Sequence, residues 1–125
     1  METVRVLVVD DQAPFRETAR LVVELTDGFE VVGEATSGEE AVERVAELRP
    51  DLVLMDLAMP GIDGIEATRL ICAPPADARV VVMLSTYDPE EHRDRAMAAG
   101  AFTFLEKSDF TPDLLEETWQ AATSA

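Results

Sequence analysis

The 125-residue sequence has few of the residues on which several kinds of protein depend. Cys72 is its one cysteine, so an intramolecular disulfide is excluded and a reducing compartment is expected. His92 is its one histidine and lies twenty residues further along the chain, where no pattern connects it to the cysteine. A catalytic thiol–imidazole pair is therefore disfavoured, and so is a zinc site, which needs more nitrogen or sulfur ligands.

Basic residues and long apolar runs are also scarce. Ten Lys and Arg stand against twenty-six Asp and Glu, which gives a formal net charge of -16. Such a chain repels nucleic acids and anionic membranes, and no basic run reverses this locally, so we expect no direct nucleic-acid binding. No apolar run approaches the roughly 20 residues that span a bilayer, and no export signal opens the chain, so we expect a cytoplasmic protein without a membrane segment.

Short apolar runs alternate with amphipathic segments along the chain. We expect five strands, each followed by a helix, at residues 4–9, 29–35, 51–55, 79–84 and 101–105. This alternation predicts an α/β fold, a doubly wound (βα)5 flavodoxin-like sandwich with a parallel sheet of order 2-1-3-4-5. The five units use residues 1–125 completely, so we expect a single domain.

Local signals refine this prediction. The first helix is expected over about residues 14–26, with Leu25 on its apolar face, and a short third helix is expected to carry Ile65, Leu70 and Ile71. Ser37 and Glu40 form a capping box that starts the second helix. The second strand is less apolar than the others, which places it nearer an edge of the sheet.

Polar side chains follow four of the predicted strands. Asp10 and Asp11 end the first strand and Asp56 ends the third, while Ser85 and Lys107 follow the fourth and fifth. In an open parallel sheet, ligands bind beyond the carboxyl ends of the strands where the strand order reverses, here between strands one and three. Three carboxylates at that point repel one another, so either one is protonated or a cation balances them. Hard oxygen ligands suit Mg²⁺ or Mn²⁺.

Asp56 is the candidate nucleophile of this site. Beside a cation it can attack phosphorus and form an aspartyl-phosphate, with charge neutralised by Lys107 and a hydrogen bond from Ser85. Each residue also has an ordinary interpretation: a carboxylate after a strand is often a helix cap, and a lysine is often a solvated charge. The arrival of reactive groups at the same end of four strands favours the site over these interpretations.

Several segments together resemble the response-regulator receiver domain of the CheY-like superfamily over essentially the whole chain. The matching segments are Val8–Asp11, Asp56–Gly64, Leu84–Ser85 and Lys107. Two further stretches, Phe29–Ala35 with Gly38–Ala41 and Gly64–Thr68, resemble the NarL/LuxR-type branch of that family. The combination is specific, whereas the acidic pair alone would not be.

The resemblance implies roles for particular residues. Asp56 would accept a phosphoryl group from a histidine kinase. Mg²⁺ would be bound directly by Asp11, Asp56 and the backbone carbonyl of Ala58, while Asp10 would act mainly through water. Ser85 would hold a phosphoryl oxygen.

The resemblance also implies a conformational switch. Ser85 and Phe104 occupy the family's switch positions, and Phe104 would turn inward when Asp56 is phosphorylated. The surface of the fourth helix, fifth strand and fifth helix would then change shape as a population shift between two states. The chain would be a signalling phospho-acceptor and not an enzyme, since it catalyses only its own phosphorylation and dephosphorylation.

Three alternatives share parts of this pattern. A haloacid-dehalogenase-type phosphatase also uses an aspartyl-phosphate and Mg²⁺, but needs a second acid where this chain has Ala58. A flavodoxin-like nucleotide or flavin binder needs a Gly- or Ser/Thr-rich turn after the first strand, whereas residues 10–14 are acidic and lack glycine. A degenerate receiver that serves only as an interaction module usually lacks one of the acids or the lysine, and this chain has lost none of them.

The output of the domain is the remaining expectation. Relatives of the NarL/LuxR type usually carry a C-terminal helix-turn-helix that binds DNA, and this sequence ends near Ala125. Either the chain is the receiver part of a longer transcription regulator, or it acts alone by docking to a partner. We favour the first reading by analogy, and a homodimer is compatible with both.

Overall fold

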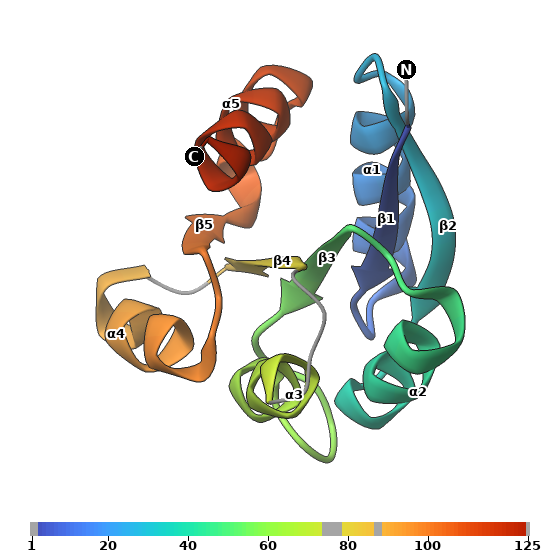
Figure 1. Cartoon of the computed structure of the whole chain (residues 1–125). Coiled ribbons are helices and arrows are strands. Elements are labelled where there is room, and N and C mark those ends of the chain that lie inside the picture. Colours follow the sequence, from blue (N-terminus) through green and yellow to red (C-terminus); the bar gives the residue numbers. More distant parts are fainter. Residues whose placement is uncertain (1–2, 74–78, 87–88, 125) are drawn as a thin grey trace.

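The computed structural model describes residues 3–73, 79–86 and 89–124. Five parallel strands form one sheet of order β2-β1-β3-β4-β5, and the chain alternates between strands and helices (Figure 1). The elements are β1 (Val4–Val9), α1 (Ala13–Glu24), β2 (Phe29–Ala35), α2 (Gly38–Leu48), β3 (Leu52–Asp56), α3 (Gly64–Cys72), β4 (Val80–Ser85), α4 (Pro89–Ala99), β5 (Thr103–Glu106), a 3-10 turn η1 (Lys107–Asp109) and α5 (Pro112–Thr123). The predicted fold class and strand order are confirmed.

Helices cover both faces of the sheet (Figure 1). One apolar cluster joins α2, α3 and α4 to one face, and a second joins α1 and α5 to the other. Alternate residues of β1 and β3 contribute to the two clusters, so these central strands are apolar on both sides. Burial on both faces explains why they appear in the sequence as continuous runs of Val, Leu and Met.

Two of the predicted site residues lie at the carboxyl ends of strands. Asp56 and Ser85 are the last residues of β3 and β4, so each of these strands runs one residue further than predicted. β2 lies at an edge of the sheet, as expected, and most of its residues are only half-buried. β5 begins two residues later than predicted, at Thr103.

The expectation that Leu25 lies on an apolar helix face is wrong, and Leu70 is also exposed. Leu25 follows the end of α1 and is 65% exposed, and Leu70 in α3 is 42% exposed. In α3 the buried positions are residues 64, 67, 68 and 71, a stripe at helical spacing that leaves Leu70 on the solvent side. The buried positions of α1 are Ala19, Val22 and Val23, and Thr26 just after the helix is also buried, whereas Leu25 lies beside them.

The Ser37 half of the predicted capping box at the start of α2 is confirmed, whereas Glu40 bonds Thr36, one residue before the N-cap Ser37. The Ser37 hydroxyl accepts a hydrogen bond from the Glu40 N–H at 3.0 Å, and the Glu40 carboxylate accepts one from the Thr36 N–H at 2.6 Å. This backbone bond lowers the pKa of Glu40. Because both side chains accept hydrogen bonds from backbone N–H groups, the first turn of α2 has a defined orientation toward the rest of the molecule.

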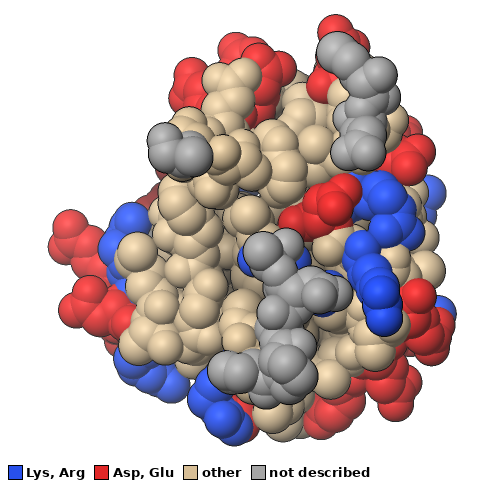
Figure 2. Space-filling model, in the orientation of Figure 1, with Lys and Arg blue, Asp and Glu red and all other residues tan. Residues whose placement is uncertain are grey.

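The surface carries the excess of acid. On the face shown in Figure 2, acidic side chains lie mainly around the rim with basic ones among them, and uncharged residues occupy much of the middle. Among the described residues, no helix is both long and apolar enough to cross a membrane. The absence of direct nucleic-acid binding stays a prediction from the charge.

Candidate functional site

Three aspartates meet at the carboxyl end of the sheet. β1 and β3 pair in parallel with Val9 opposite Met55, so the next residues, Asp10 and Asp56, lie side by side. Carboxylate oxygens of Asp10, Asp11 and Asp56 lie within 4.8 Å of one another. Asp10 is fully buried and Asp56 is 5% exposed, while Asp11 is half-buried. The structure therefore brings together the acids that the sequence placed at the point of strand reversal.

Lys107 joins this cluster from the end of β5. Its Nζ lies 2.6 Å from Oδ2 of Asp10 and 3.1 Å from Oδ1 of Asp56. The ammonium also lies 4.5 Å from the centre of the Phe15 ring, a cation–π distance. Contacts with Asp10, Asp56 and Phe15 thus orient the lysine within a largely buried site.

The turn after β1 holds Asp10 in place. The N–H of Gln12 donates to Oδ1 of Asp10 at 2.8 Å, and Arg16 Nη1 donates to the Asp10 carbonyl oxygen at 2.9 Å. Nε of Arg16 also lies 3.3 Å from the Glu34 carboxylate, which ties this turn to β2. With one oxygen bound by Gln12 and the other by Lys107, Asp10 has both carboxylate oxygens engaged.

The loop after Asp56 is closed by a backbone hydrogen bond between its two ends. The Leu57 N–H donates to the Leu84 carbonyl at 3.3 Å, and the Gly64 N–H donates to the Leu57 carbonyl at 2.8 Å. Asp63 caps α3 by accepting from the Glu66 N–H at 2.8 Å. Ala58 lies exposed within this loop, two residues after Asp56.

The electrostatics of the site follow from burial. Burial and, after it, the charge of Asp10 raise the pKa of Asp56, Lys107 opposes both, and the net pKa is about 6. Burial alone would lower the pKa of Lys107, but its hydrogen bond to Asp10 and the charge of Asp56 outweigh this and raise it. At neutral pH, Asp56 is therefore ionised against repulsion from its neighbours, a repulsion that a cation would relieve.

This raised pKa predicts how stability depends on pH. Because folded Asp56 binds its proton more tightly than the unfolded chain does, it costs the protein stability as pH rises from about 4 to 7. In metal-free buffer we expect Asp56→Asn to be more stable than wild type by about 2–3 kcal/mol above pH 7, and by well under 1 kcal/mol near pH 4. Urea unfolding in EDTA at several pH values measures this difference. A difference that does not change with pH would contradict the raised pKa.

The donor set fits a hard divalent cation. Three carboxylates offer oxygen ligands from two adjacent strand ends, and neither histidine nor cysteine belongs to the cluster. Oxygen ligands alone suit Mg²⁺ and Mn²⁺ and disfavour zinc. The residues present therefore fit the cation that the sequence predicted.

Ser85 and Phe104 lie on neighbouring strands beside the cluster. Ser85 is 1% exposed and lies one residue after Leu84, which pairs with Asp56 across β3 and β4. Phe104 is fully buried, and its ring stacks on the imidazole of His92 with centroids 6.3 Å apart. The structure thus has Phe104 in the inward position, and its movement on phosphorylation stays a prediction.

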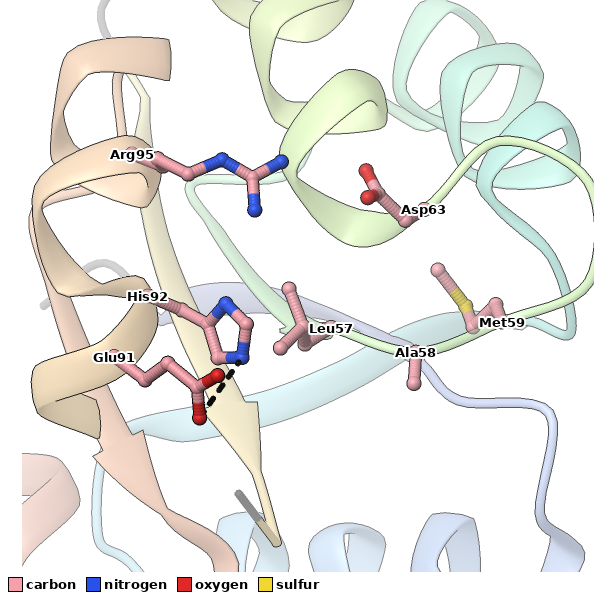
Figure 3. Close-up of a pocket in the computed structure, with 7 residues that line it drawn as sticks. All are labelled: Leu57, Ala58, Met59, Asp63, Glu91, His92 and Arg95. Carbon is pink, nitrogen blue, oxygen red and sulfur yellow. Dashed lines mark ion pairs between the residues drawn. The ribbon is translucent and has the colours of Figure 1, made fainter. Parts of the chain in front are cut away.

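A pocket of about 450 Å³ lies next to this site, between α4 and the loop after β3. Figure 3 shows the His92 ring and the Arg95 guanidinium reaching from α4 toward that loop, with Glu91 beside His92. The lining residues are Leu57, Ala58, Met59, Asp63, Glu91, His92 and Arg95. None of the three clustered aspartates lines this pocket, so it is a neighbour of the acidic site and not part of it.

Three contacts of the site were not predicted from the sequence. Phe15 was expected only as a core residue of the first helix, and Gln12 and Arg16 were given no role. Gln12 acts through its backbone N–H, which no residue type signals. Arg16 lies in the first turn of the helix that follows Asp10 and Asp11, and this position indicates a contact with the site only once the fold is known.

Comparison with known proteins agrees with this geometry. The model of the response regulator receiver domain matches residues 6–119. A solved structure of a NarL signal receiver domain from Mycobacterium tuberculosis is 32% identical, with a TM-score of 0.89 and coverage of 100% of both chains. The structural match therefore covers all five strands, and both matches include all the residues of the acidic site.

Curated relatives are longer than this chain. A protein-glutamate methylesterase/protein-glutamine glutaminase of Myxococcus xanthus is 44% identical over 104 residues, which are 83% of this chain and 30% of that protein. The transcriptional regulatory protein LiaR of Bacillus subtilis is 37% identical over 113 residues, 90% of this chain and 53% of that protein. The chain thus spans about half of one relative and less than a third of the other.

Proposed function

The chain belongs to the response regulator receiver domain family, and we propose from that premise that it accepts a phosphoryl group from a histidine kinase on Asp56 in a Mg²⁺-dependent reaction. Receiver domains are signalling domains of two-component systems, interact with histidine kinases and bind Mg²⁺ in an acidic pocket. The observation that carries the proposal is the convergence of three aspartates with the Lys107 ammonium, 3.1 Å from Asp56.

The proposed transfer uses the carboxylate of Asp56 as nucleophile. One oxygen attacks phosphorus, and the bond from phosphorus to the imidazole nitrogen of the kinase breaks, with the electron pair leaving on that nitrogen. Lys107 lies where it can stabilise charge on the phosphoryl oxygens, and the hydroxyl of Ser85 would hydrogen-bond one of them. Asp11, Asp56 and the Ala58 carbonyl would hold Mg²⁺, with Asp10 acting through water, and the bound cation would supply further positive charge there.

The proposed switch connects this site to the surface of α4, β5 and α5. Phosphorylation would draw the Ser85 hydroxyl toward the phosphoryl group and favour the state in which Phe104 is buried. The stacking of Phe104 on His92 supports this route, because it joins β5 directly to α4. Phe104 pairs with Met83, two residues before Ser85 on β4, so packed side chains connect this part of β4 to α4.

We propose transcription regulation as the output. The name of LiaR supports this, and its greater length leaves room for the DNA-binding helix-turn-helix expected of a NarL/LuxR-type regulator. A homodimer is compatible with this output. The methylesterase relative supports a second candidate, in which a receiver of this kind controls a linked enzyme.

Removal of the metal tests the proposed reaction. We expect the purified protein, with acetyl phosphate and Mg²⁺, to gain the mass of one phosphoryl group, and to gain none in excess EDTA, because the three carboxylates then repel the donor. Intact mass spectrometry measures both. No modification with Mg²⁺ would favour a degenerate interaction module. Sustained release of phosphate from a phosphate ester would favour a phosphatase.

A further inference from the structure

The first turn of α2 contacts the loop of residues 57–63, which connects β3 to α3 and which we call the β3–α3 loop. Oε2 of Glu39 accepts a hydrogen bond from the Ile62 N–H at 3.3 Å. One residue earlier, Gly38 packs against the same residue: a Cβ at Gly38 would lie 2.8 Å from the Ile62 carbonyl oxygen. α2 and the loop therefore meet closely at two consecutive positions.

The conformation of Gly61 suits the Glu39 carboxylate in two ways. Gly61 has φ +80°, in the left-handed region that favours glycine. A Cβ at Gly61 would lie 2.5 Å from Oε2 of Glu39, so the carboxylate occupies the space that a side chain would need. Glu39 thus lies directly against the backbone of two consecutive loop residues.

The remainder of the β3–α3 loop is held at its ends and at Met59, which packs into the apolar core. Leu57 is bonded to β4 and to Gly64, and Asp63 caps α3. Between these ends Met59 is buried and Ala58 is exposed. The contact with Glu39 restrains the part of the loop that follows Ala58.

We infer that Glu39 is a positioning residue, whose carboxylate holds Gly61 and Ile62 and thereby restrains the loop that carries the Ala58 carbonyl. The inference rests on the proposed function, in which that carbonyl ligates Mg²⁺. A loop already held in one conformation loses less entropy when it binds the cation, so the cation binds more tightly. A negative charge in the first turn also favours helix α2, and the experiment has to separate these two effects.

The first measurement is amide hydrogen exchange at Ile62 in metal-free protein. Glu39→Ala should speed this exchange about five- to tenfold, because Ile62 loses one hydrogen bond to a charged acceptor at an exposed position. Glu39→Gln should stay within about twofold of wild type, because its side-chain carbonyl can still accept the bond. Glu43→Ala is the matched control: it removes the same charge from an exposed position one turn along α2 and should leave Ile62 unchanged.

The second measurement is the Mg²⁺ dependence of phosphorylation by acetyl phosphate. In Glu39→Ala the Mg²⁺ concentration for half-maximal rate should rise about three- to fivefold, while the rate at saturating Mg²⁺ stays within about twofold. A role limited to the stability of α2 would leave this concentration unchanged. Glu43→Ala should behave as wild type.

The two measurements separate failure of the inference from failure of the proposed function. If wild type is not phosphorylated but Ile62 exchange responds to Glu39→Ala alone, the proposed reaction is wrong and the contact between Glu39 and the loop stands. If wild type is phosphorylated and Glu39→Ala changes neither exchange nor Mg²⁺ dependence, the positioning role is wrong. Equal changes in Glu39→Ala and Glu43→Ala would show a general charge effect and would also overturn it.

Discussion

Asp56→Asn should gain no phosphoryl group under conditions in which wild type gains one. The amide oxygen is a poor nucleophile, and the substitution leaves shape and burial nearly unchanged, so the loss would reflect chemistry and not folding. Asp56 is the last residue of β3, is 5% exposed and lies 3.1 Å from Lys107, which places it at the centre of the site. Intact mass after incubation with acetyl phosphate and Mg²⁺ measures the result.

Asp63→Asn is the matched control for this experiment. Asp63 lies in the same loop, but its carboxylate caps α3 and does not belong to the acidic cluster. We expect Asp63→Asn to be phosphorylated, with a modest loss of stability from the weaker cap. Phosphorylation of Asp56→Asn would show that another residue, such as Asp10 or Asp11, is the acceptor.

Gly64→Ala should both destabilise the protein and impair phosphorylation. A Cβ at Gly64 would lie 2.1 Å from the carbonyl oxygen of Asp56 and 3.0 Å from the Leu57 Cα, and these are backbone atoms that cannot rotate away. We expect a loss of on the order of 3 kcal/mol, because α3 or the end of β3 has to shift. Urea unfolding measures the stability, and the rate of modification by acetyl phosphate shows whether Asp56 has moved.

Gly28→Ala separates this clash from the ordinary cost of replacing a glycine. Gly28 has φ +87°, but a Cβ there would meet nothing within 4 Å. We expect it to lose about 1 kcal/mol from backbone strain alone and to be phosphorylated normally. If Gly64→Ala proved no more harmful than Gly28→Ala in either measurement, the close approach of α3 to Asp56 would not constrain the site.

The fold was predictable because its signals are local and repeated. Each central strand is an uninterrupted apolar run, since both its faces are buried, and each helix carries its own apolar stripe. The edge position of β2 was visible in its lower apolarity. The 3-10 turn that begins at Lys107 was not predicted, because three residues show no period.

The acidic cluster was predictable for a related reason. In a parallel sheet the residue that follows each strand lies at one edge, so Asp10, Asp56 and Lys107 could be assigned to one place from their position in the sequence. The exposed position of Leu25 and Leu70 was not predictable from apolarity, because the direction of a helix face depends on how the helix docks. Apolar residues are common on surfaces, so their presence alone did not decide it.

The sequence by itself therefore determined the strand order, the two-sided covering of the sheet and the set of acids with their lysine. Only the tertiary structure decided that Phe15 lies against Lys107, that Gly64 leaves room for the Asp56 carbonyl and that Glu39 holds the β3–α3 loop. The physical reason is distance along the chain. Periodicity records the environment of each element, whereas these contacts arise where atoms of separate elements approach within a few ångströms.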